Sequence, residues 1–364
     1  MGGRVAILGT GLIGGSIGLG LAAGRLGADI VGYDPDARAG ASAHQRGAVG
    51  SVAGSAAEAV TGAAMVIVCM PVDLMPASFA GLKEQVPPDA VVTDVGSAKG
   101  GVVRAGESAF GARFVGGHPM AGSERHGAAA ADGRLFEAAS WILTPTARTS
   151  SSAYASVTEV VSALGATAVA LDPQVHDDLV ARVSHLPQLA ASALVDLAVG
   201  TGSRKELLGL AGPGFRDVTR IAASNPDLWV AIIKSNPQAV LDGLVRLEDK
   251  LRSLRHSLAD ERWGELRSFL EAARSSRLEL FAKPEFGGQP VGLSMLVPDR
   301  PGVLAEVTTA AGELGANIED LRIVHSTEGG RGRLELVVAG EASATRLVER
   351  LRALGYRAEK EQVS

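Results

Sequence analysis

The chain has 364 residues, 46% of them hydrophobic and 21% charged, which is enough to bury the cores of two or three domains. A net charge of −5, with no Lys/Arg-rich stretch standing out, argues against nucleic acid as a partner. No apolar run is long enough to span a membrane, and no secretion leader precedes the first expected strand, so we expect a cytoplasmic protein.

Cys69 is the single cysteine, which excludes a disulfide within the chain. Its place at the end of an apolar run predicts a buried, unreactive thiol. No cluster of residues has the spacing of metal ligands, and we expect no metal site.

The first part of the chain alternates short apolar runs with alanine-rich helical stretches. The expected strands are residues 5–8, 29–33, 65–70, 90–95, 141–143 and 166–171. This alternation predicts an α/β domain over residues 1–171, with a doubly wound, mostly parallel sheet of the Rossmann type.

A glycine-rich run joins the first expected strand to the first expected helix, and consists of Gly9, Thr10, Gly11, Leu12, Ile13 and Gly14. It matches the dinucleotide-binding fingerprint in the required context. In that fingerprint Gly9 permits the tight turn, Gly11 lets the backbone approach the pyrophosphate at the helix N-terminus, and Gly14 lets helix pack on strand. A purely structural glycine loop is the alternative. We assign Pro71, which follows the third expected strand, to the same cofactor site.

Asp34 ends the second expected strand about twenty residues after the glycines. A carboxylate there binds the ribose hydroxyls and repels a 2′-phosphate, so NAD is favoured over NADP. Arg38 lies near enough to weaken this preference, although we interpret it as an exposed helical residue. The alternative role for Asp34 is a cap of the following helix.

After Asp172 and Pro173, strand patterns disappear and helical periodicity takes over, which predicts an all-helical second domain over residues 172–283. Apolar residues recur there at spacings of four and three, at Val240, Leu244, Leu247, Leu251, Leu254 and Leu258. This stripe fits either a core within the chain or a subunit interface.

A Gly/Pro-rich stretch from Lys283 to Pro290 marks a linker. Beyond it, the expected order is strand (291–297), helix (303–314), strand (318–326), strand (333–338), helix (342–354) and strand (356–361). This order predicts a ferredoxin-like βαββαβ domain over residues 290–364.

Further segments accompany the glycine loop, namely TDVGSAKG at residues 93–100, HPMAGSE at 118–124, VSHLP at 183–187 and FRDVTRIA at 215–222. Together and in this order, they make the chain similar to the prephenate/arogenate dehydrogenase family of tyrosine biosynthesis, from Arg4 to about Phe281. The resemblance implies an oxidative decarboxylation, in which the ring carbinol of prephenate gives a hydride to NAD, carbon dioxide leaves, and 4-hydroxyphenylpyruvate forms.

Other activities stay open. Arogenate dehydrogenase, which forms tyrosine directly, is one, because the two substrates differ only in a keto or ammonium group on the side chain. More distant are a β-hydroxyacid dehydrogenase, for which Lys234 would be the base, and a non-catalytic sensor that binds NAD and an amino acid.

The resemblance implies that His118 accepts a proton or a strong hydrogen bond from the ring hydroxyl. An imidazole suits this role because it is neutral at working pH and still basic. We place His118 in a glycine-rich turn, where a structural loop histidine is the alternative. Ser97, after the expected strand at 90–95, would position the hydroxyl and the nicotinamide; a helix N-cap is its alternative.

Arg220 is the candidate for binding a substrate carboxylate, because its planar guanidinium matches two carboxylate oxygens. The alternative is a pair with Asp217, which we also assign to the substrate site. By resemblance His185, Glu124 and Ser123 line the same pocket, although His185 beside Pro187 fits a helix break as well.

Gln188 stands where many relatives have a second histidine, which puts recognition of the substrate side chain in doubt. We expect the remaining histidines to be surface or capping residues: His44, His126, His176, His256 and His325.

The segment from Asp299 to Leu304, with Gly315 to Ile318 later, resembles the ACT regulatory domain, which implies side-by-side pairing and amino-acid binding near this loop. Gly302 at a helix N-terminus suits an amino-acid carboxylate. We therefore expect a homodimer regulated by tyrosine or a related aromatic amino acid, through Asp299, Arg300, Gly302, Val303, Asn317 and Ile318. A domain that only dimerises is the alternative.

Overall fold

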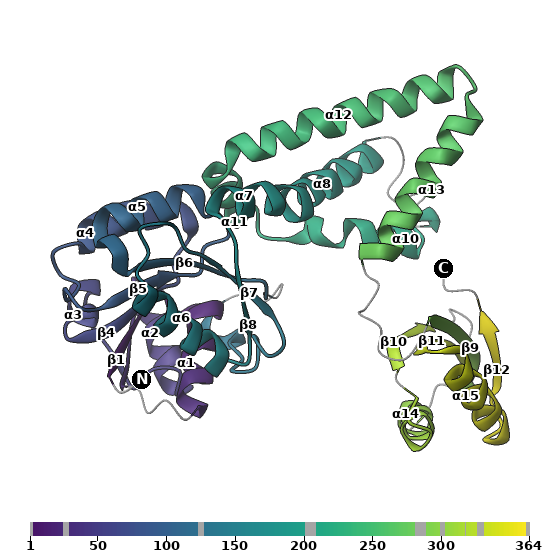
Figure 1. The fold of residues 1–364 in the computed structure, drawn as a ribbon, viewed down its shortest axis with the longest axis horizontal. Coiled ribbons are helices and arrows are strands. Elements are labelled where there is room, and N and C mark those ends of the chain that lie inside the picture. The colour runs from purple at the N-terminus through teal and green to yellow at the C-terminus, as the bar shows by residue number, and fades with distance from the viewer. Residues whose placement is uncertain are drawn as a thin grey trace. The chain divides into compact units, whose positions relative to one another are not determined.

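The computed structural model describes residues 3–24, 29–122, 127–200, 209–280, 289–298, 303–316, 318–325 and 331–361 (Figure 1). Contacts divide the chain into two units, Met1–Ser253 and Leu254–Ser364. In the described residues, no helix combines the length and the apolar character that crossing a membrane requires.

The described part of the first unit contains an eight-stranded sheet with the order β3-β2-β1-β4-β5-β6-β7-β8. Its strands are β1 (Arg4–Leu8), β2 (Asp29–Tyr33), β3 (Ser51–Val52), β4 (Ala63–Val68), β5 (Val91–Asp94), β6 (Phe114–Pro119), β7 (Ser140–Thr144) and β8 (Thr167–Ala170). Only the β6–β7 pairing is antiparallel among these strands, so the predicted mostly parallel Rossmann-type sheet is confirmed. The strand order reverses at β1 and β4, and ligands of such folds bind at the carboxyl ends of the strands there.

Helices cover both faces of this sheet. Helices α1 (Leu12–Ala23), α2 (Ala37–Gln45) and α6 (Ser151–Ala163) pack on one face, and α3 (Ala56–Val60), α4 (Met75–Leu82) and α5 (Gly100–Phe110) pack on the other (Figure 1). In β1, Val5 and Ile7 face the first layer, whereas Ala6 and Leu8 face the second. Burial on both faces explains why this strand is a continuous apolar run in the sequence.

Between Pro173 and Leu280, the described residues form helices and no strand, as predicted. These are α7 (Pro173–Val180), a π-helical turn (Ala181–His185), α8 (Leu186–Val199), α10 (Pro213–Thr219), η5 (Arg220–Ala223), α11 (Pro226–Ser235), α12 (Pro237–Ala259) and α13 (Trp263–Leu280). Asp172 caps α7 by accepting the N–H groups of Gln174 and Val175.

The predicted apolar stripe lies on α12. Val240 at its start is buried, but Leu251 is 57% exposed and Leu258 is 51% exposed. With Leu244 also exposed, half of the six stripe residues are exposed, which favours the subunit-interface interpretation.

The C-terminal domain has the predicted βαββαβ order. Its elements are β9 (Pro290–Pro298), α14 (Val303–Glu313), β10 (Ile318–His325), β11 (Arg331–Ala339), α15 (Glu341–Ala353) and β12 (Arg357–Glu361). In the described residues, the four strands form an antiparallel sheet with the order β10-β11-β9-β12. One apolar core, with Leu293, Val307 and Leu347 fully or almost fully buried, joins the sheet to its two helices.

Candidate active site

A cavity of about 490 Å³ lies at the carboxyl ends of β1, β4 and β5. Among the predicted site residues, its lining includes Gly11, Leu12, Ile13, Pro71, Ser97 and His118. Leu228 and Ile232 of α11 close it from the helical part. The fold thus brings the glycine loop and the histidine of the HPMAGSE run to one opening, although they are far apart in the sequence.

The glycine loop has the geometry that a dinucleotide requires. Gly9 has a φ of +98°, and a Cβ on it would lie 2.6 Å from the carbonyl oxygen of Cys69. A Cβ on Gly14 would lie 1.9 Å from the Gly9 carbonyl oxygen, whereas a Cβ on Gly11 would meet nothing within 4 Å. Helix α1 also begins without a side-chain cap or an acidic first turn. Its N-terminus therefore remains suited to an anionic group such as a pyrophosphate.

Asp34 is fixed beside this loop. One carboxylate oxygen accepts the Thr10 N–H at 2.7 Å, and the other accepts the Asp36 N–H at 3.0 Å. The cap of α2 is Asp36, which accepts the N–H of the exposed Arg38, so the alternative that Asp34 caps this helix is wrong. Asp34 thus holds the end of β2 against the loop, in the position where ribose hydroxyls bind in this fold.

His118 lies in strand β6 and not in a turn, so that expectation is wrong. It pairs with Ile142 of β7 and is partly buried. The glycines before it suggested a turn, but they are needed for close packing. A Cβ on Gly117 would lie 2.6 Å from the carbonyl oxygen of Asp94 on the neighbouring strand. The strand gives His118 a more rigid support than a turn would.

The ring of His118 belongs to a buried hydrogen-bonded chain. Its Nδ1 lies 2.9 Å from Nε2 of His176, and Nδ1 of His176 lies 2.9 Å from a carboxylate oxygen of Asp177. His176 is only 1% exposed, and Asp172 is the residue that caps α7, so the expectation that His176 is a surface or capping residue is wrong. The physical reason is that α7 packs its polar side against α5. There the Asp177 carboxylate accepts the N–H groups of Lys99 at 2.6 Å and Gly100 at 2.7 Å.

A buried ion pair supports the residue before His118. Lys99 and Asp94 have side chains that are fully buried, and the Lys99 ammonium contacts the Asp94 carboxylate. The ammonium also donates to the carbonyl oxygen of Gly117 at 2.7 Å, and Asp94 accepts the Gly117 N–H at 3.2 Å. Asp94 thus binds the Gly117 N–H and Lys99 binds the Gly117 carbonyl, so the pair fixes the backbone immediately before His118. Sequence reasoning missed this pair, although both residues belong to the segment that contains Ser97.

Burial and charge shift the titration of these groups. Burial, with smaller effects of His176, Lys99 and His185, holds the pKa of His118 well below its ordinary value. Burial acts to raise the pKa of Asp177, but the hydrogen bonds from His176, Lys99 and Gly100 bring it below its usual value. Burial lowers the pKa of Lys99, an effect that Asp94 partly offsets. At neutral pH the site therefore contains a neutral His118 and an ionised Asp177, with His176 between them.

Ser97 and Cys69 face the same cavity. Ser97 is half-buried, and α5 begins at Gly100 with Lys99 at its cap position and no side-chain cap bond. The alternative that Ser97 caps this helix is therefore wrong. Cys69 is half-buried rather than buried as expected. Burial and the nearby Asp94 raise the pKa of its thiol, which favours the protonated form.

Other predicted substrate residues lie apart from this lining. Arg220 and Asp217 are exposed on η5 and α10. His185, in the π-helical turn, is 1% exposed and has its ring 6.1 Å from that of Trp229; burial lowers its pKa to about 4. Nδ1 of His185 and Oε1 of the buried Gln188 lack hydrogen-bond partners among the described residues. A π-helical turn of this kind often accompanies a functional site.

Some predicted residues lie outside the residues that the structure describes or outside the cavity lining. Ser123 and Glu124 lie outside the described residues. Lys234, the base expected for a β-hydroxyacid dehydrogenase, is exposed on α11 and is not part of the lining. In the ranges that the structure describes, no group of three His, Cys, Asp or Glu side chains is placed to hold a metal ion.

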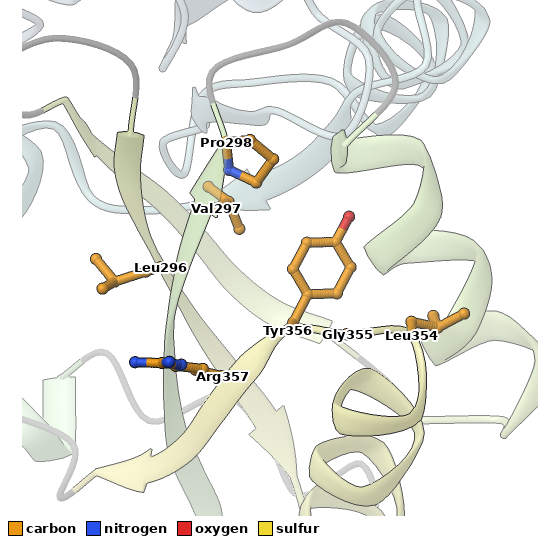
Figure 2. A pocket seen from close by; sticks show the side chains of 7 residues that line it. All are labelled: Leu296, Val297, Pro298, Leu354, Gly355, Tyr356 and Arg357. Atoms are coloured by element: carbon orange, nitrogen blue, oxygen red, sulfur yellow. The ribbon is translucent and has the colours of Figure 1, made fainter.

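The C-terminal domain has a hollow of about 430 Å³ between the end of β9 and the turn from α15 to β12. Figure 2 shows Tyr356 standing between Leu296, Val297 and Pro298 on one side and Leu354 on the other. The Tyr356 hydroxyl donates to Glu306 of α14.

The predicted regulatory residues are only partly described. Asp299, Arg300, Gly302 and Asn317 lie outside the described residues. Val303 is buried in the core of this domain, and Ile318 packs against that core.

Comparison with known proteins identifies relatives along most of the chain. Three family models match: prephenate dehydrogenase, nucleotide-binding domain, at residues 18–170; prephenate dehydrogenase, dimerization domain, at 172–272; and ACT domain at 291–356. The prephenate dehydrogenase of Bacillus subtilis is 32% identical over 91% of each chain. The cyclohexadienyl dehydrogenase of Zymomonas mobilis is 30% identical over 76% of this chain and 96% of its own.

Solved structures agree with these matches. Aquifex aeolicus prephenate dehydrogenase, in complex with hydroxyphenyl propionate and NAD⁺, has a TM-score of 0.72 and 32% identity, covering 76% of this chain and 98% of its own. Synechocystis arogenate dehydrogenase has a TM-score of 0.67 and 29% identity, covering 76% of this chain and 99% of its own.

Proposed function

This chain belongs to the prephenate dehydrogenase family of NAD-dependent oxidoreductases, and we propose that it catalyses the oxidative decarboxylation of prephenate to 4-hydroxyphenylpyruvate with His118 as the base. The proposal depends mainly on one observation. His118 opens on the same cavity as the glycine loop and Ser97, so a ring alcohol and a nicotinamide would meet beside its imidazole. Direct formation of tyrosine from arogenate uses the same chemistry and is the second candidate.

His118 has the chemical role of holding one proton during the reaction. It accepts the proton of the ring hydroxyl while the adjacent C–H bond breaks, so that charge does not accumulate on the oxygen. NAD, when bound along the glycine loop, supplies the hydride acceptor. As the ring carbon–carboxylate bond breaks, its electron pair makes the ring aromatic, and His118 returns the proton to the phenol oxygen. The reaction therefore consumes no net proton, and a neutral buried imidazole suits both transfers.

The remaining site residues bind and orient. Ser97 positions the hydroxyl and the nicotinamide, and Asp34 holds the ribose, with Gly9 to Gly14 and Pro71 around the cofactor. Arg220 binds a substrate carboxylate, and His185, Ser123, Glu124 and Asp217 complete the substrate site. The unpartnered buried nitrogen of His185 supports its part in this assignment, because buried polar atoms normally have a partner.

Steady-state kinetics test the function directly. We expect kcat/KM to be highest with prephenate and NAD, and lower with arogenate or NADP. A preference for arogenate would select the second candidate. Absence of NADH formation with either substrate would instead support a non-catalytic sensor of NAD and an amino acid.

We also propose a homodimer with domains at residues 1–171, 172–283 and 290–364. The match to a dimerization domain and the exposed stripe on α12 support an interface in the helical domain. Light scattering on the native chain and on Leu251→Glu tests this: the native chain should be a dimer, and the variant should dissociate at micromolar concentration. A variant that remains fully dimeric would exclude α12 from the interface.

A regulatory role for the C-terminal domain is the last part of the proposal. We propose that it binds tyrosine or a related aromatic amino acid through Asp299, Arg300, Gly302, Val303, Asn317 and Ile318. The hollow lined by Pro298 is in the size range of small-molecule sites, and Pro298 directly precedes Asp299 in the sequence. Tyrosine should inhibit the full chain but not a shortened chain that ends near Phe281. Equal inhibition of both would assign the effect to the active site.

A further inference from the structure

We propose that His176 and Asp177 are a positioning pair that sets the tautomer of His118 and leaves its Nε2 free of a proton for the substrate. This inference rests on the proposed function, because it explains how His118 is kept ready to act as a base. It assigns a role to two residues of α7 that belong to the helical part of the chain, whereas His118 belongs to the sheet.

The hydrogen-bonded chain determines where each proton lies. The Asp177 carboxylate can only accept, and it faces Nδ1 of His176 at 2.9 Å, so that nitrogen carries a proton. In a neutral His176, Nε2 is then an acceptor. It faces Nδ1 of His118 at 2.9 Å, so Nδ1 of His118 is the donor. A neutral His118 with its proton on Nδ1 has an unprotonated Nε2, the form that a general base requires.

The opposite tautomer would not work as a base. If Nδ1 of His118 accepted a hydrogen bond from His176, Nε2 of a neutral His118 would carry the single ring N–H and could only donate. An imidazole populates both tautomers when neither ring nitrogen has a fixed hydrogen-bond partner. A carboxylate that fixes the tautomer of a catalytic histidine contributes strongly to the reaction rate. The Asp177 carboxylate, one residue further along the chain, thus acts on His118 through His176.

The same chain stabilises the state in which His118 holds the proton. The resulting imidazolium donates to His176, which donates to the carboxylate, so the positive charge faces an ionised group through one neutral ring. The N–H groups of Lys99 and Gly100 keep that carboxylate fixed and ionised. His176 is 1% exposed and Asp177 is 4% exposed, so water does not compete for these bonds.

Two substitutions at His176 separate positioning from packing. In His176→Phe a ring of similar size remains, but the acceptor for Nδ1 of His118 is lost. In His176→Gln the side-chain oxygen can still accept a hydrogen bond from Nδ1–H of His118. We expect His176→Phe to lower kcat about 100-fold or more, within the range attributed to general-base catalysis, with the KM for NAD and substrate changed less than about threefold. His176→Gln should recover at least about tenfold of that loss.

Asp177→Asn tests the second member of the pair. The asparagine amide has two orientations. In the first, its NH₂ group faces the Gly100 N–H; in the second, it faces both Nδ1–H of His176 and the Lys99 N–H. In the second orientation His176, and with it His118, changes tautomer. Asp178→Asn is the matched control, because Asp178 neighbours Asp177 on α7 and accepts a hydrogen bond from the exposed Gln174. The control should retain native kinetics. Thermal unfolding and NAD binding of every variant report whether a loss of activity reflects loss of the fold.

Nitrogen NMR of the histidine side chains reads the tautomer without turnover. With the His118 signals assigned by difference from His118→Asn, the native enzyme should show a protonated Nδ1 and a bare Nε2, and folded Asp177→Asn should show a mixture or the reverse. A native His118 protonated at Nε2, or a His176→Phe variant within about threefold of native kcat, would overturn the inference. If His118→Asn itself retained native turnover while the NMR pattern held, the proposed function would fail and the tautomer assignment would stand.

Discussion

The buried pair of Lys99 and Asp94 should be a main support of both stability and activity. Lys99→Met keeps the length of the side chain but removes the ammonium, which leaves the Asp94 carboxylate uncompensated in a site with no exposed surface. Removing one member of a buried pair costs about 3–5 kcal/mol of unfolding free energy. For a domain of this size, a loss of that order lowers Tm by about 6–20 °C.

Urea unfolding followed by circular dichroism measures this loss, with thermal unfolding as a second assay. Arg4→Met is the matched control, because Arg4 pairs with Asp29 at 3.0 Å at the surface of the same sheet. That pair has side chains 40% and 57% exposed, so its removal should cost no more than about 1 kcal/mol. If Lys99→Met costs as little as Arg4→Met, the ion pair does not support the fold as we have argued.

Removing both charges should separate stability from catalysis. Asp94→Asn combined with Lys99→Met eliminates the isolated carboxylate, so the double variant should be more stable than the sum of the single losses predicts. The Gly117 carbonyl still loses its ammonium donor, and the strand that presents His118 loses that support. We therefore expect the double variant to regain stability while kcat stays low; recovery of both together would assign the pair a purely structural role.

The remaining predictions concern individual site residues. His118→Asn should lower kcat about 10²–10⁴-fold with NAD affinity near normal, which stopped-flow turnover and NAD titration measure. Because a base works only when unprotonated and the pKa of His118 lies well below its ordinary value, kcat/KM should stay constant as pH falls through about 6.5 and decrease only below that; a decline centred at or above that value would contradict this. Asp34→Ser should raise kcat/KM with NADP relative to NAD, since the carboxylate repels a 2′-phosphate; an unchanged ratio would exclude Asp34 from ribose binding. Arg220→Gln should raise the substrate KM more than about tenfold with a smaller change in kcat, and an unchanged KM would remove Arg220 from the site.

Local patterns were sufficient for most of the fold. Hydrophobic periodicity predicted the central strands, the helical middle and the βαββαβ order, because these elements bury continuous apolar faces. It missed β6, where Gly116 and Gly117 have low strand propensity. Those glycines are required by neighbouring atoms, since a Cβ on Gly116 would lie 2.4 Å from the Thr144 hydroxyl. Local sequence does not contain that information, because the constraint comes from β7.

The candidate site likewise has residues that local sequence predicts and residues whose role depends on tertiary contacts. The glycine loop, Asp34 and Ser97 follow strands that the sequence predicts, whereas His118 lies within β6 and was predicted from its motif alone. His176 and Asp177 could not be found by that reasoning, because a polar pair at the start of a helix usually faces water. Asp177 accepts the backbone N–H groups of Lys99 and Gly100, at the start of α5, which are 78 and 77 positions away in sequence. The ring of His176 faces His118, 58 positions away. Only the tertiary structure makes this polar face of α7 a buried one.

Lys99 binds both the sheet domain and the helical part of the site. Its side chain binds Asp94 and the Gly117 carbonyl within the sheet domain, and its backbone N–H binds Asp177 of the helical part. The strand that carries His118 and the helix that sets the His118 tautomer are therefore fixed to the same point. A displacement of α7 relative to α5 would disturb both the position of the imidazole and the location of its proton. Proton transfer requires both to be correct at once, because the distance to the substrate hydroxyl and the availability of Nε2 enter the same step.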